Sequence, residues 1–158
     1  MRRPFAIVLA LLAALVLSAC GTSSQVTKRY APAAGDQFAY TIDNRGGMSE
    51  ENLVTLRSSL DGQLRAAGLL AASPSNAARR VTITINEYRM RHGAARALVG
   101  IMAGKDTIRS TVEVVGSDGE VLGSSEIDSG NSTAWGTTGG LVEGHAEEIA
   151  NFLRGTSG

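Results

Sequence analysis

The first twenty residues, Met1–Cys20, determine where a folded domain can begin. Two arginines give the segment a positive start, and an unbroken apolar run follows from Phe5 to Leu17. A basic start, a short apolar run and small residues before a cleavage point are the three parts of a secretory signal peptide. The run is shorter than the roughly 20 residues that a membrane-spanning helix needs. We therefore predict that residues 1–19 are a signal peptide and are removed on export.

The segment ends in Leu17-Ser18-Ala19-Cys20, which resembles the lipobox of bacterial lipoproteins. The resemblance implies that diacylglycerol is attached to Cys20, that the chain is cut just before it, and that the new amino terminus is acylated, usually with palmitate. An ordinary signal would end in an Ala-x-Ala-like site, and a structural cysteine would have no reason to follow the apolar run directly. Gly21 stands where an Asp would mark retention in the inner membrane. The expected location is the periplasmic face of the bacterial outer membrane, through a lipid anchor.

Length and charge limit the remaining possibilities. Removal of residues 1–19 leaves 139 residues, enough for one domain with its own core. The chain has 15 basic and 15 acidic residues, so no field of one sign is available to attract nucleic acid. Because Cys20 is the only cysteine, no disulfide is expected. We predict a flexible tether over residues 20–35, a single domain over 36–154 and a tail over 155–158.

The first half of this domain predicts a strand, a helix and a second strand. Residues 38–42 alternate between apolar and more polar side chains, which is the period of a half-buried strand. Ser49 can cap a helix that Gly68 would end, since leucines recur between them every three or four residues. A second alternating run extends from Val81 to Tyr88. The helix would then cross over between two parallel strands.

The second half predicts a hairpin and a final helix. Residues 108–114 alternate, Asp118-Gly119 indicates a tight turn, and residues 121–127 return as the partner strand. Apolar residues at helical spacing then run from position 141 to 153, followed by Gly155. The order β-α-β-β-β-α predicts an α+β fold of two layers, a mixed sheet with two helices on one face.

Residues 92–105 join two of the predicted strands and are apolar, small and glycine-rich. Gly100 and Gly104 lie four residues apart, so in a helix they would let another backbone approach closely. The segment can pack on its own sheet, present a surface to a second copy or another protein, or insert into a membrane. Arg96 and the short apolar length argue against insertion. Arg96, Leu98, Gly100 and Gly104 are the candidates for contact with a partner.

A second resemblance covers roughly residues 36–154. The pattern Arg96-x-x-x-Gly100-x-x-x-Gly104, then an alternating strand, then Gly116-x-Asp118-Gly119-x-Val121-Leu122, resembles an uncharacterised family of small bacterial lipoproteins with a domain of unknown function. The layout is also similar, more loosely, to periplasmic domains of lipoproteins that oligomerise in secretion or transport assemblies. The family carries no catalytic residues that could be transferred to this chain.

Signals for chemistry are weak. Gly100 to Lys105 is superficially similar to a phosphate-binding loop, but it has three residues between its glycines and Asp106 where a Ser or Thr is needed. His145 and Glu148 have a spacing that could pair metal ligands on a helix, but His145 lies on the apolar stripe and is expected in the core. No nucleophile elbow occurs. We expect no catalytic site, no metal and no cofactor.

The only tryptophan, Trp135, lies in a Gly/Ser/Thr loop over residues 129–140. It could contact a protein or a glycan, or cover the end of the core. We therefore expect a non-enzymatic, lipid-anchored protein that acts through protein contacts in a cell-envelope assembly, with a homo-oligomer or an envelope protein as its partner. The alternative is a binding module for a small ligand or a cell-wall glycan, with Trp135 as the stacking residue.

Overall fold

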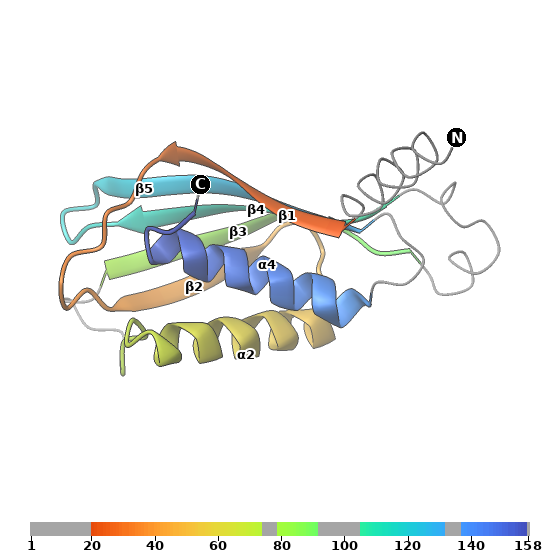
Figure 1. The fold of residues 1–158 in the computed structure, drawn as a ribbon, viewed down its shortest axis with the longest axis horizontal. Coiled ribbons are helices and arrows are strands. Elements are labelled where there is room, and N and C mark those ends of the chain that lie inside the picture. The colour runs from red at the N-terminus through yellow and green to blue at the C-terminus, as the bar shows by residue number, and fades with distance from the viewer. Residues whose placement is uncertain (1–19, 74–78, 92–104, 132–136, 158) are drawn as a thin grey trace, which may run out of the picture.

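The structure, a computed structural model, describes residues 20–73, 79–91, 105–131 and 137–157. In this part of the chain five strands form one sheet, and two helices lie side by side over one of its faces (Figure 1). The predicted α+β fold and the order β-α-β-β-β-α are confirmed, with one additional strand ahead of them. No helix in the described ranges is long and apolar enough to cross a membrane.

The sheet is mixed and has the strand order β1-β5-β4-β3-β2. Strand β2 is parallel to β3, as predicted, and the remaining neighbours are antiparallel. The parallel pair follows from the helix between its two strands, because a crossover returns the chain in the same direction. The strands are β1 (Cys20–Lys28), β2 (Phe38–Asn44), β3 (Arg79–Arg89), β4 (Asp106–Val115) and β5 (Val121–Asn131).

The two helices are α2 (Glu50–Ala66) and α4 (Thr138–Leu153). The leucine stripe predicted for α2 is buried, at positions Leu53, Leu56, Leu60 and Leu64. Ser49 precedes α2 as predicted, but its side chain makes no capping bond and accepts instead from Asn52. Helix α4 begins three residues before the predicted start, where the Thr137 hydroxyl accepts the backbone N–H of Gly140 at 3.0 Å.

The core lies between the helices and the inner face of the sheet. Alternate residues of the three central strands are buried there, among them Ile83, Val112 and Ile127. Tyr30, in the connection before β2, is also buried, and its ring meets that of Phe38 in a T-shaped contact, with 5.8 Å between the centroids. The outer face of the sheet carries no helix and is polar, as an uncovered antiparallel face requires.

Residues 20–28, for which the sequence predicts a flexible tether, form strand β1 in the structure. The strand pairs antiparallel with β5 from Cys20, opposite Asn131, to Lys28, opposite Ser124. Its side chains carry no strand signal, and none of those described is buried. We attribute β1 to the backbone N–H and C=O groups of β5, which would be unpaired at the edge of the sheet without it, rather than to the side chains of β1.

Candidate functional site

The end of the sheet at which β1 begins combines the predicted anchor with the flanks of both predicted contact segments. Asn131, the last residue of β5, is the Cα partner of Cys20 on one side and of Asp106 on the other. The described chain stops at Arg91, resumes at Lys105 and stops again at Asn131, all at this end (Figure 1). We call this the Cys20 end of the sheet.

A buried ion pair holds the Cys20 end together. The Arg91 guanidinium and the Asp106 carboxylate approach to 3.2 Å, with side chains 4 % and 1 % exposed. Asp106 also accepts the backbone N–H of Arg91 at 2.8 Å, and the guanidinium donates to the backbone carbonyl of Asn131 at 2.9 Å. A buried charge is tolerated only with such partners, because desolvation costs several kcal/mol for each ion. The pair therefore fixes the ends of three strands relative to one another.

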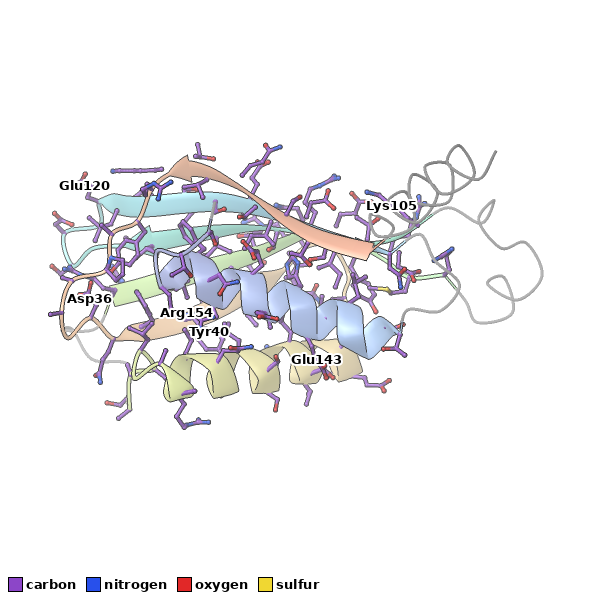
Figure 2. The ribbon with its side chains drawn as sticks, viewed as in Figure 1. Asp36, Tyr40, Lys105, Glu120, Glu143 and Arg154 are labelled. Atoms are coloured by element: carbon purple, nitrogen blue, oxygen red, sulfur yellow. The ribbon has the colours of Figure 1, made fainter. Side chains whose placement is uncertain are left out.

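Exposed charges cross the outer face of the sheet beside this end. Arg109 of β4 lies between Glu87 of β3, at 2.9 Å, and Asp128 of β5, at 2.8 Å. The hydrogen bond to Asp128 and the charges of both carboxylates raise the pKa of the Arg109 guanidinium. Lys105 lies 4.0 Å from Asp128 and stands at the Cys20 end in Figure 2. Basic and acidic side chains alternate across this face, so their net charge is close to zero.

An open hollow of about 570 Å³ lies over strands β1, β5 and β4 on the same face. Gly21 and Gly130, which are partners across the ladder, leave its floor without side chains. Its walls are polar and charged, and its lining includes Ser23, Gln25, Lys105, Arg109, Glu126 and Asp128. The lining has no aromatic side chain on which a sugar ring could stack.

A buried polar chain runs from α4 to the edge strand on the inner face. His145 is fully buried, and its two ring nitrogens lie 2.8 Å from the Ser110 hydroxyl and 2.7 Å from the Ser129 hydroxyl. Ser129 in turn lies 3.0 Å from the Thr22 hydroxyl of β1. Burial lowers the pKa of His145 to about 4, although the charges of Asp128 and Glu148 act in the opposite direction. The imidazole is therefore neutral near pH 7 and bonded on both sides.

Glu148, one turn further along α4, makes a second contact with β1. Its carboxylate accepts from the Ser24 hydroxyl at 2.7 Å and from Ser157 at 3.0 Å. Burial opposes ionisation of Glu148, but hydrogen bonds from Ser24, Asn151 and Ser157 hold its pKa below the ordinary value. Strand β1 is thus fastened to α4 by hydroxyl groups on its inner face.

A second hollow, of about 670 Å³, separates the exposed sides of the two helices. Val54 of α2, the one exposed large apolar side chain among the described residues, lies on one side of it. Glu143 and Glu147 of α4 lie on the other, and Figure 2 labels Glu143 there. The rest of its lining is hydroxyl, amide and glycine residues, namely Thr55, Ser58, Ser59, Gln63, Gly140 and Gly144.

Of the predicted site residues, Cys20 is the first residue of β1 and lies opposite Asn131 at the Cys20 end of the sheet. Arg96, Leu98, Gly100, Gly104 and Trp135 fall outside the described residues, and only their flanks are placed. The prediction that His145 belongs to the core is confirmed. In the described ranges, no group of three or more His, Cys, Asp or Glu side chains could hold a metal ion.

Sequence reasoning missed the Arg91–Asp106 pair and the polar chain that joins α4 to β1. Asp106 gave one signal, an acidic residue at the start of a predicted strand with alternating apolar residues. Nothing in the pattern indicated Arg91 as its partner. Ser110 stood on a predicted strand and Ser129 in the predicted loop 129–140, without any sign that both would contact His145.

Comparisons with known proteins extend this description. The model of a family described as "Domain of unknown function (DUF4410)" matches residues 43–136. No curated protein matches the chain. A point variant of PelC from Paraburkholderia phytofirmans, solved as a dodecamer, is similar with a TM-score of 0.62 and 21% sequence identity, over 87% of this chain and 98% of that one. A PelC dodecamer from the same organism in another space group gives 0.60 and 19%, over the same shares. At this identity the likeness shows the fold alone.

Proposed function

The chain belongs to the DUF4410 family, and from that premise we propose that it is a non-enzymatic, lipid-anchored domain that acts through protein contacts in a cell-envelope assembly. The lipid would be carried by Cys20, on the periplasmic face of the outer membrane. The contacts would be made by residues 92–104 and 132–136. The first partner to test is a second copy of the same chain.

One observation carries this proposal: three strand ends and the candidate lipid site share the Cys20 end of the sheet. Cys20 pairs with Asn131, which pairs with Asp106, and Arg91 binds both of their strands. A lipid at Cys20 would therefore set both candidate segments close to the membrane surface and restrict how copies can meet there. The buried ion pair supplies the rigidity that a repeated contact between copies requires.

The fold gives the second support. Two PelC chains of similar fold were solved as dodecamers. A ring of copies needs two different surfaces on each subunit. The described part of this chain offers a polar sheet face and a helical face with the hollow between α2 and α4. It has no large apolar patch, so we assign the main contacts to the glycine-rich segment that contains Arg96 and Leu98.

The deciding experiment is native mass spectrometry of the lipidated protein, extracted gently from membranes. We expect a multiple of the protomer mass. Gly100→Leu or Gly104→Leu should shift the mass to the monomer with unchanged circular dichroism, because a bulky side chain blocks close backbone approach. Gly62→Leu is the matched control, since Gly62 lies on the exposed side of α2 with nothing within 4 Å. A wild-type monomer with nothing bound would contradict the proposal.

A further inference from the structure

Strand β1 differs from the other strands in how it is held. The buried side chains of β3 and β4 include Ile83 and Val112, whereas no described side chain of β1 is buried. Its inner face consists of Thr22, Ser24 and the partly buried Val26. Apolar burial is the main force that holds an element in a fold, and β1 has almost none of it.

Strand β1 is held by its backbone ladder with β5 and by side-chain contacts that water can replace. The side-chain hydrogen bonds of its inner face are the Thr22–Ser129 hydroxyl pair, the Ser24–Glu148 bond, and a weak bond from the Ser125 hydroxyl to the Gln25 carbonyl at 3.3 Å. Lys28 adds exposed contacts with Glu120 and the carbonyl of Val121. Each of these groups keeps a hydrogen-bond partner in water when the strand leaves.

Strand β5, the neighbour of β1, could serve as the edge strand of the sheet if β1 were released. On its inner face β5 places Ser125, Ile127 and Ser129 beside β1. Two of these three side chains are hydroxyls, which water can solvate when β1 leaves. The apolar Ile127 would keep its cover from α4, which packs against β5.

A firm attachment follows immediately after the strand. Tyr30 is 4 % exposed, packs its ring on Phe38, and donates its hydroxyl to Asp36 at 2.6 Å. Asp36 is held in turn by Arg79 of β3 at 3.2 Å. The backbone of Gly123 lies directly against Tyr30. Release of β1 would stop at this residue, so the rest of the domain would stay folded.

We propose that residues 20–29 are a releasable strap. While it is paired with β5, the strap holds the Cys20 end of the domain against the lipid surface. Released, it is a tether of up to ~30 Å between the lipid and Tyr30, at ~3.3 Å per residue, and the domain can turn about Tyr30 and move away from the surface. The inference rests on the proposed lipid attachment of Cys20. It assigns to one segment both the strand of the structure and the tether that the sequence predicts.

Hydrogen exchange tests the strap on the lipidated protein in vesicles of phosphatidylethanolamine and phosphatidylglycerol. We expect the amides of β1 to exchange at least 100-fold faster than those of β4. Ser24→Ala should increase the β1 rate about ten-fold, because the lost bond to Glu148 is charge-assisted. Ser23→Ala is the matched control, since Ser23 is exposed on the opposite face of the same strand. Equal rates for the two variants, or β1 amides as slow as those of β4, would overturn the proposal.

A reversible disulfide between β1 and β5 tests whether release of the strap changes the distance of the domain from the bilayer. Gln25 and Glu126 are ladder partners and both are exposed, so Gln25→Cys with Glu126→Cys allows a disulfide between β1 and β5. Neutron reflectometry on a supported bilayer should find a thinner protein layer when this protein is oxidised than when it is reduced. Identical layers would contradict the strap. A protein that fails to bind the vesicles would contradict lipid attachment instead, and hydrogen exchange in solution would still report on the strand.

Discussion

At the scale of single residues, His145 shows how burial sets protonation. Its ring is enclosed between α4 and the sheet and bonded at both nitrogens by Ser110 and Ser129. A charged imidazole would need both serine hydroxyls to accept, and it would lose its hydration in the core. The neutral form is therefore the one that the fold supports.

His145 should make the fold sensitive to mild acid. Its pKa is about 4 in the folded protein and about 6.5 when unfolded, so the unfolded state binds the extra proton between these values. Stability is fully present above pH 6.5 and falls by about 3 kcal/mol as the pH drops to 4. We expect urea unfolding of residues 20–158 to show this loss, and His145→Gln to remove most of it. The same pH slope in both proteins would refute the assignment.

Gly123 should resist substitution because of Tyr30. A Cβ at Gly123 would lie 2.5 Å from the Tyr30 Cβ and 3.1 Å from its Cα, so backbone would have to shift. We expect Gly123→Ala to destabilise the fold by about 2 kcal/mol through overpacking. Gly62→Ala, in the exposed part of α2, should be neutral or stabilising by up to about 1 kcal/mol. Thermal unfolding of the two variants measures the difference, and similar melting temperatures would contradict the packing.

At the scale of elements, apolar periodicity in the sequence predicts the helices and the central strands. It does not predict the strand and the ion pair that are held by polar groups. The leucine stripe of α2, the alternation of β3 and β4, and the Asp118-Gly119 turn were all readable, because each is a local pattern. Strand β1 was not, since its hydroxyl side chains suit a tether as well as an edge strand. The Arg91–Asp106 pair joins residues from separate elements, and no spacing rule links them.

Replacement of one partner of the buried Arg91–Asp106 ion pair should strongly destabilise the fold. Asp106→Asn removes the carboxylate charge that faces the buried Arg91 guanidinium, and we expect a loss of about 3 kcal/mol in urea unfolding. Asp43→Asn removes an exposed partner of Arg45 and should change stability by less than about 0.5 kcal/mol. Equal effects of the two substitutions would show that the buried pair does not hold the three strand ends.

At the scale of the whole molecule, the sheet separates two ends with different roles. Figure 2 shows Lys105 at the Cys20 end and Glu120 at the opposite end, beside the turn between β4 and β5. The proposed lipid site, Cys20, and the flanks of both candidate contact segments, Arg91, Lys105 and Asn131, lie at the first end.

Cys20→Ser should uncouple the domain from the membrane without unfolding it. The thiol is the predicted lipid acceptor, whereas the core begins only at Tyr30. We expect the variant to remain at the bottom of a flotation gradient while the wild type rises with the membranes. Circular dichroism of the two proteins should agree. A variant that still floats would place the membrane attachment elsewhere in the chain.

The pairing of β1 with β5 also has a consequence in time. Thr22 and Ser129, which meet across this ladder, are separated by 107 positions in the chain. A chain made and exported from its amino terminus exposes β1 long before β5 exists, so β1 has no strand to pair with at that stage. Under the proposed export and lipidation, Cys20 would then be presented on an unpaired segment while the signal is processed. The first strand of the domain can therefore join the sheet only after β5, the last strand in the chain, has formed.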